Sequence, residues 1–196
     1  MNIQAMKQSL RQSIIAARLA IASEERLRLS NEIASRIRKL ASYKEAVTVA
    51  GYMNFGAEFA AEVFMQHALN DGKQVILPKV NKNTKQLDLY RVTDLALDIA
   101  PGNWNIREPI IDRCKQVEDL TTVDFILLPG VAFGLDGARL GYGGGFYDKL
   151  LVHMPHQPTL VAAAYALQVV EDIPQEDTDR KIEWLVTEQE TIRCVA

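Results

Sequence analysis

A glycine-rich segment between an arginine and an aspartate is the part of the chain that most directly suggests chemistry. Most of the eleven glycines lie between Gly130 and Gly145, just before residues 146–153, which the pattern predicts as a helix. Glycine has no Cβ, so the backbone N–H groups of such a loop can approach an anion, and a helix start adds free donors. Arg139 can bond two phosphate oxygens, and Asp148 offers oxygen ligands that suit Mg²⁺. The segment predicts a phosphate site, although a tight turn packed only for shape would contain the same glycines.

Two common phosphate motifs do not fit this segment. A Walker loop needs lysine followed by serine or threonine after the last glycine, and here Phe146 and Tyr147 follow it. The dinucleotide fingerprint belongs near the start of a strand–helix–strand unit, with an acidic residue further along. The segment is therefore a different kind of loop.

A second group of charged residues lies near the start of the chain. Residues 7–21 contain no glycine or proline, and apolar residues recur every three or four positions, which predicts a helix. At 3.6 residues per turn, Lys7, Arg11 and Arg18 fall within about 40° of one another. They form either one side of an anion site or a solvated basic face.

Length and composition favour one soluble domain. With 196 residues, 48% of them hydrophobic, residues 1–196 can form a single core. The net charge of −3 argues against a nucleic-acid partner. No apolar run approaches the ~20 residues that cross a bilayer, and the start lacks a signal-peptide pattern. We expect a cytoplasmic monomer without a membrane partner, in which Cys114 and Cys194 are unpaired thiols.

Strand and helix patterns alternate along the chain. The pattern predicts a three-layer αβα sandwich with a largely parallel central sheet and ligands at the carboxyl ends of its strands. Strands are expected at residues 47–53, 74–77, 87–92, 123–128, 159–165 and 184–187, and helices at 7–21, from 23 to about 40, at 60–70 and at 146–153. Residues 93–119 are expected to form surface loops with a short helix, and residues 171–181 an acidic loop.

The segment from Leu128 to Asp148 resembles the signature of the 5-formyltetrahydrofolate cyclo-ligase family, also called methenyltetrahydrofolate synthetases. Further blocks resemble the family in the same order, so the likeness spans almost the whole chain. These blocks are residues 7–11 with Arg18, 51–58, 75–79, 104–109 and 174–188.

The resemblance implies a reaction and its partners. ATP and Mg²⁺ would drive ring closure of 5-formyltetrahydrofolate to 5,10-methenyltetrahydrofolate with release of ADP and phosphate. The formyl oxygen would take the γ-phosphoryl group before the N10 nitrogen attacks the activated carbon. The small-molecule partners would be a reduced folate and ATP.

The resemblance also implies roles for individual residues. Catalytic roles fall to Arg139, Tyr142 and Lys7. ATP contacts fall to Lys7, Gln8, Ser9, Leu10, Arg11, Arg139, Leu140, Gly141, Tyr142, Gly143, Gly144, Gly145, Phe146 and Tyr147. Folate contacts fall to Arg11, Met53, Glu58, Tyr142, Gly143, Gly144, Gly145 and Phe146. The magnesium ligands would be Asp148 and Asp179.

Some positions differ from the family pattern, and other functions remain open. Ala60 and Ala61 stand where aspartate and threonine are common, and Phe146 stands where tyrosine is frequent, which affects folate contacts. In the late acidic segment, Thr178 replaces a common histidine and Glu183 a common aspartate.

A noncatalytic nucleotide or folate-binding module is the main alternative to the enzyme. A phosphosugar isomerase or acyl-CoA transferase rests on fold analogy alone. For Glu58, the alternative to a folate contact is an exposed carboxylate on a loop.

Overall fold

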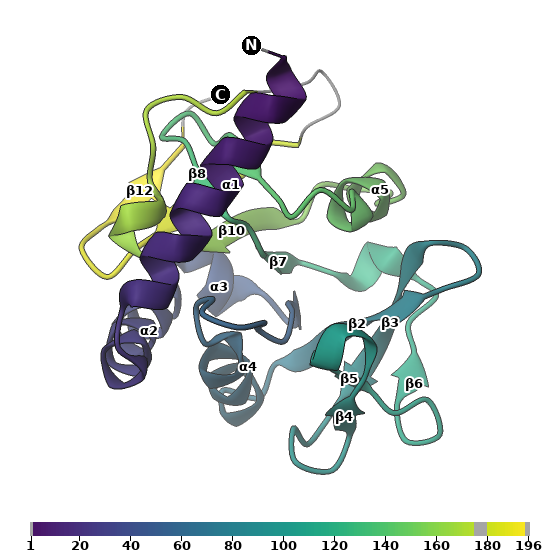
Figure 1. The fold of residues 1–196 in the computed structure, drawn as a ribbon. Helices are drawn as coiled ribbons and strands as arrows, with labels where there is room; N and C mark the ends of the chain where they lie inside the picture. The colour runs from purple at the N-terminus through teal and green to yellow at the C-terminus, as the bar shows by residue number, and fades with distance from the viewer. Residues whose placement is uncertain (1, 175–179, 195–196) are drawn as a thin grey trace.

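The computed structural model describes residues 2–174 and 180–194, and within them an eight-stranded sheet forms the centre of the molecule (Figure 1). The strands are β1 (Thr48–Ala50), β2 (Gln74–Asn81), β3 (Gln86–Val92), β6 (Lys115–Gln116), β7 (Phe125–Leu128), β10 (Thr159–Ala163), β11 (Trp184–Val186) and β12 (Thr191–Arg193). Their order across the sheet is β12-β11-β10-β7-β1-β2-β3-β6. The five strands from β11 to β2 are parallel, and antiparallel strands extend both edges.

The central parallel strand β7 is apolar because both of its faces are covered. All four residues of β7 are buried, and Phe125 pairs in register with Val49 of β1 and Thr159 of β10. Phe125 and Leu127 face one hydrophobic core, while Ile126 and Leu128 face another. The predicted alternation of strands and helices is confirmed, and so is the largely parallel sheet.

Helices form the outer layers. The helices α2 (Ser23–Ile37), α3 (Ala41–Glu45) and α4 (Ala61–Asn70) pack on the face that carries Val49 and Leu127, and α5 (Phe146–Val152) packs on the opposite face. The long helix α1 (Ile3–Ala20) crosses in front of the sheet (Figure 1). It packs through Leu10 and Ile14 against the small hairpin of β8 (Ala132–Phe133) and β9 (Arg139–Leu140).

The sequence did not predict several short elements. Residues 93–119 contain a hairpin of β4 (Ile99–Pro101) and β5 (Arg107–Pro109), whose tip is the 3₁₀ turn η1 (Asn103–Asn105). Two further 3₁₀ turns are η2 (Leu120–Thr122) and η3 (Ala166–Gln168). Strands β8, β9 and β12 were also missed, because two or three residues are too few to show a period of two.

Replacing Leu127 by alanine tests whether the β7 core stabilises the fold. Leu127 is 0% exposed, so Leu127→Ala should lower the free energy of unfolding by about 2–5 kcal/mol. Leu97→Ala is the matched control, because Leu97 is 58% exposed and should lose no more than about 0.5 kcal/mol. Urea denaturation followed by circular dichroism measures both values. Equal losses in the two variants would contradict this description of the core.

Candidate active site

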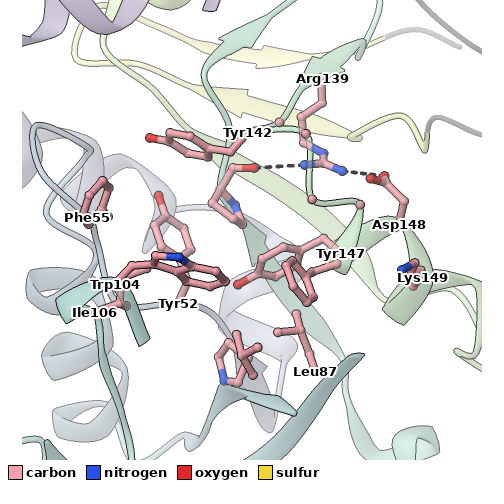
Figure 2. Close-up of a pocket in the computed structure, with 18 of the residues that line it drawn as sticks. Tyr52, Phe55, Leu87, Trp104, Ile106, Arg139, Tyr142, Tyr147, Asp148 and Lys149 are labelled. Atoms are coloured by element: carbon pink, nitrogen blue, oxygen red, sulfur yellow. Dashed lines mark hydrogen bonds and ion pairs between the residues drawn. The ribbon is translucent and has the colours of Figure 1, made fainter. Parts of the chain in front are cut away.

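A cavity of about 950 Å³ lies where β1 and β7 end at their carboxyl edge (Figure 2). The backbone after β1 contributes Tyr52 and Met53 to its wall, and the backbone after β7 contributes Pro129. Helices α1 and α5, residues 139–145 (the glycine segment) and the hairpins β2–β3 and β4–β5 complete the lining. Residues far apart in the sequence therefore meet around one space.

The arginine and the aspartate that flank the glycines face each other (Figure 2). Arg139 is buried, and its Nη2 atom donates to Oδ1 of Asp148 at 2.6 Å. Its Nη1 atom donates to the carbonyl oxygen of Pro129 at 3.2 Å, while its buried Nε atom lacks a hydrogen-bond partner within the part of the chain that the structure describes. The pair places a fixed positive charge and a partly exposed carboxylate on the cavity wall.

The glycine segment owes its shape to backbone conformations that favour glycine. Gly143 has φ +101° and Gly145 has φ +63°, both in the left-handed region. Gly145 is also the residue that caps the start of α5. A Cβ at Gly143 would lie 3.7 Å from the guanidinium of Arg11, an ordinary contact distance, so a side chain there would be disfavoured by the backbone conformation alone.

Arg11 and Arg18 of α1 contact this segment and Lys7 lines the same cavity, so these cations do not form a solvated face. Lys7 and Arg18 are buried, and the Nε atom of Arg11 donates to the carbonyl oxygen of Gly141 at 2.8 Å. Lys7, Gln8 and Arg11 line the cavity. Arg18 does not line the cavity, but it contacts Tyr142, which does.

Glu58 lies at the other side of the cavity and is only 6% exposed, so the alternative of an exposed loop carboxylate is wrong. Its Oε2 atom accepts from the backbone N–H of Phe55 at 2.6 Å. Burial raises the pKa of Glu58, while the Phe55 N–H, the neighbouring Tyr142 and the charge of Arg18 oppose that rise. The result is a buried acceptor next to an apolar wall that includes Met53.

Aromatic and aliphatic side chains close the remaining sides (Figure 2). Trp104, at the tip of the β4–β5 hairpin, packs edge-on against Phe146 with ring centroids 6.3 Å apart. Burial raises the pKa of Tyr52 and of Tyr147, so both hydroxyls stay neutral near neutral pH. Flat rings on several sides suit a ligand with planar groups.

Most of the residues with an implied catalytic or binding role line this cavity, and two of those that the structure describes do not. Those on the wall are Lys7, Gln8, Arg11, Met53, Glu58, Arg139, Leu140, Gly141, Tyr142, Gly143, Gly144, Gly145, Phe146, Tyr147 and Asp148. Ser9 is exposed and Leu10 packs against Ile14, so neither side chain lines the cavity. About the helix axis, Ser9 and Leu10 are rotated by roughly 200° and 300° from Lys7.

Several lining residues had no predicted role. They are Gln4, Tyr52, Phe55, Pro78, Val80, Leu87, Trp104, Ile106, Arg107, Glu108, Pro129, Lys149 and Val152. Residues 104–109 already formed a recognisable block, which was the available signal for Trp104 and Glu108. The strand residues Val80 and Leu87 gave no local sign of which face would meet the cavity.

Asp148 is the candidate magnesium ligand that the structure describes. Its partly exposed carboxylate lies on the cavity wall, and one oxygen contacts Arg139. Asp179 lies outside the described residues. Among residues 2–174 and 180–194, no group of three or more histidine, cysteine, aspartate or glutamate side chains could hold a metal ion. One carboxylate fits Mg²⁺ that arrives with nucleotide, because that ion keeps water and phosphate oxygens as its other ligands.

No helix within residues 2–174 and 180–194 is long and apolar enough to cross a membrane.

Comparisons with known proteins identify the family of this chain. The family model described as the 5-formyltetrahydrofolate cyclo-ligase family matches residues 3–188. A probable 5-formyltetrahydrofolate cyclo-ligase from Caenorhabditis elegans is 30% identical, over 97% of this chain and 96% of the relative. The 5-formyltetrahydrofolate cyclo-ligase of Escherichia coli (strain K12) is 30% identical, over 87% of this chain and 93% of the relative.

A solved structure is similar over nearly the same length. The structure of Aquifex aeolicus 5,10-methenyltetrahydrofolate synthetase superposes with a TM-score of 0.84 at 35% sequence identity, covering 96% of this chain and 93% of that one. The family match, the relatives and the shared fold agree, and the chain belongs to the 5-formyltetrahydrofolate cyclo-ligase family.

Proposed function

We propose that this chain is an enzyme that uses ATP to convert 5-formyltetrahydrofolate to 5,10-methenyltetrahydrofolate. The observation that carries the proposal is a shared wall: residues 141–147 line the same cavity as Arg139 and Asp148 on one side and Glu58 on the other. A triphosphate and a folate can therefore meet across one loop. The cavity of about 950 Å³ is near the upper end of the usual range for small-molecule sites, as two substrates require.

The reaction proceeds in two bond exchanges. The formyl oxygen attacks the γ-phosphorus of ATP, and ADP leaves with the electrons of the broken P–O bond. The N10 nitrogen then bonds to the formyl carbon and loses its proton, and phosphate departs with the former formyl oxygen. Phosphoryl transfer leaves little covalent chemistry to the protein, so its side chains act by positioning and by neutralising charge.

The phosphate side of the site combines cations with backbone donors. Lys7 and Arg139 neutralise the transferred phosphoryl group, and Arg11 and Gln8 hold the remaining phosphates with the N–H groups of residues 140–147. Asp148, together with Asp179 of the family pattern, would hold Mg²⁺, which would supply further neutralisation of the phosphate charge. Arg139 fixes one oxygen of Asp148 at 2.6 Å, which leaves its other oxygen to face a cation.

The folate side uses a buried acceptor. Glu58 accepts hydrogen bonds from the donor groups of the pterin, and Met53 and Phe146 provide apolar contact. Tyr142 and the neighbouring glycines lie between this pocket and the phosphates, so they orient the formyl oxygen toward the γ-phosphorus.

Residues 1–196 act as one domain, as a cytoplasmic monomer without a nucleic-acid or membrane partner. The lining of the cavity by residues from α1 through α5 supports one catalytic unit.

The purified protein should form the methenyl product when it is given ATP, Mg²⁺ and 5-formyltetrahydrofolate. The absorbance of 5,10-methenyltetrahydrofolate measures the product, and omission of ATP is the control. A folded protein that gives no product under these conditions would contradict the proposed activity.

Arg139→Ala and Asp148→Ala should chiefly reduce kcat, each by about 100- to 1000-fold, because each removes charge stabilisation of the phosphoryl transfer. Asp148→Ala should also raise the Mg²⁺ concentration needed for half-maximal rate. Arg28→Ala and Asp112→Ala are charge-matched controls on exposed surface and should keep the parental rate. Parental kcat in both site variants would rule out the assigned phosphate site.

Glu58→Gln should mainly raise KM for the folate, by about 10- to 100-fold, because a charged acceptor of hydrogen bonds becomes neutral. KM for ATP should change by less than about two-fold, since Glu58 lies on the folate side. Steady-state kinetics with each substrate varied in turn separates the two constants. Equal increases in KM for the folate and KM for ATP would contradict the assignment of Glu58 to the folate pocket.

A further inference from the structure

The loop between β1 and α4, residues 51–60, carries side chains of the proposed folate pocket, among them Met53 and Glu58. Its turn closes on itself. The Glu58 N–H donates to the Phe55 carbonyl oxygen at 3.3 Å, and the Glu58 carboxylate accepts from the Phe55 N–H at 2.6 Å. Bonds within a turn fix its shape, but they do not fix its place relative to the rest of the protein. Contacts with other elements are needed to hold Glu58 against the cavity.

Two buried hydroxyl groups from other elements hold this loop. Ser30 of α2 is buried, and its Oγ atom accepts from the Ala60 N–H at 3.0 Å. Tyr165, which follows β10, is buried as well, and its hydroxyl donates to the Glu58 carbonyl oxygen at 3.1 Å. The two hydroxyl oxygens lie 3.2 Å apart. Neither side chain lines the cavity, so both act on the backbone of the loop from behind the wall.

The direction of each hydrogen bond follows from the protons that are available. The Ala60 N–H can only donate, so the Ser30 oxygen accepts there. The Glu58 carbonyl oxygen can only accept, so it takes the single Tyr165 hydroxyl proton; the Arg26 carbonyl oxygen is farther from that hydroxyl, at 3.4 Å. The Ser30 proton is then donated to the Tyr165 oxygen. Burial raises the pKa of Tyr165, so its hydroxyl keeps its proton near neutral pH.

These bonds form a closed ring, hereafter the hydroxyl ring, which runs from Ala60 through Ser30 and Tyr165 to Glu58 and back along the loop. Every donor in the ring has one acceptor, and hydrogen bonds that polarise one another in a buried site strengthen together. Removal of either hydroxyl leaves the other buried groups without a partner. The hydroxyl ring therefore acts as a unit.

Tyr165 is itself fixed in place. Its backbone N–H donates to Oε1 of Gln168 at 3.0 Å, and Nε2 of this buried glutamine donates to the Val131 carbonyl oxygen at 2.9 Å. Strand β10, which precedes Tyr165, is paired with β7 and β11. The hydroxyl ring thus ties the loop of Glu58 to the sheet and to the backbone that follows β7.

We propose that Ser30 and Tyr165 are positioning residues for the reduced folate, which hold the backbone at Glu58 so that its carboxylate faces the pterin. This inference rests on the proposed function, because it takes Glu58 as the folate contact. A loop that is held in place before the ligand arrives loses less conformational entropy on binding. Breaking the hydroxyl ring should therefore weaken folate binding although no contact with the ligand is removed.

Direct binding measurements test the two hydroxyl groups. Ser30→Ala and Tyr165→Phe each break the hydroxyl ring and leave every side chain of the cavity wall unchanged. Each should weaken the binding of 5-formyltetrahydrofolate, measured by isothermal titration calorimetry without ATP, by about ten-fold. Affinity for ATP with Mg²⁺, measured in the same way without folate, should stay within about two-fold of the parental value, because the hydroxyl ring lies on the folate side.

Tyr43→Phe is the matched control. Tyr43 is also buried, its hydroxyl donates to Oδ2 of Asp71 at 2.7 Å, and it does not line the cavity. This variant should lower the melting temperature as Tyr165→Phe does and should keep the parental folate affinity. Equal losses of folate affinity in Tyr43→Phe and Tyr165→Phe would indicate general destabilisation and would overturn the inference.

A double-mutant cycle with Glu58→Gln tests whether Tyr165 acts through Glu58. Tyr165→Phe should weaken folate binding by about ten-fold in the parent but by less than about three-fold in the Glu58→Gln protein, because residues of one network are not additive. An equal effect in the two backgrounds would contradict the positioning role. If Tyr165→Phe does not fold, Ser30→Ala replaces it in the cycle, since it breaks the same hydroxyl ring from α2.

Failure of this inference is distinguishable from failure of the proposed function. If the parent forms the methenyl product while Ser30→Ala and Tyr165→Phe both bind folate with parental affinity, the positioning role alone is overturned. If the folded parent forms no methenyl product, the proposed function is overturned.

Discussion

The packing of helix α1 against the glycine segment determines the geometry of the site. A flexible glycine loop has many accessible conformations, and ordering it costs conformational entropy. Arg11 donates to the carbonyl oxygen of Gly141, and Arg18 donates to the hydroxyl of Tyr142. These contacts join residues 130 and 124 positions apart in the sequence. The loop is therefore held by cations from the start of the chain, and the same cations set its electrostatic character.

The sheet supplies the rigid part of the same arrangement. Strand β7 has β1 and β10 as its neighbours, and all of its side chains are buried, so the position of Pro129 just beyond it is well determined. The side chain of Arg139 reaches the end of β7 and donates to the Pro129 carbonyl oxygen. Strand β1 ends beside it and leads to Tyr52 and Met53. The phosphate side and the folate side thus share one fixed edge of the sheet, which limits how far they can move apart.

The sequence predicted those parts of the structure that follow from local pattern. The apolar run at residues 123–128, the helical spacing of α1 and the glycine segment each have a short-range signal, and the structure has β7, α1 and the loop at these places. Contacts between distant segments had no such signal. The burial of Glu58 and the packing of Trp104 on Phe146 depend on tertiary packing. The Arg139–Asp148 pair falls between these cases, since both residues were singled out but their mutual contact was not expected.

The charge of the cavity explains why so many cations are brought together in a chain whose net charge is −3. Among residues 2–174 and 180–194, the cationic side chains of Lys7, Arg11, Arg107, Arg139 and Lys149 line the cavity, against the carboxylates of Glu58, Glu108 and Asp148. The wall is thus net positive inside a net negative protein, a distribution that concentrates field lines in the cleft and attracts anions. Both proposed substrates are anions. In the structure, Asp148 neutralises part of the charge of Arg139. A magnesium ion at Asp148 would offset that carboxylate, and the guanidinium would then act on the phosphate with more of its charge, so nucleotide and metal should bind more tightly together than separately.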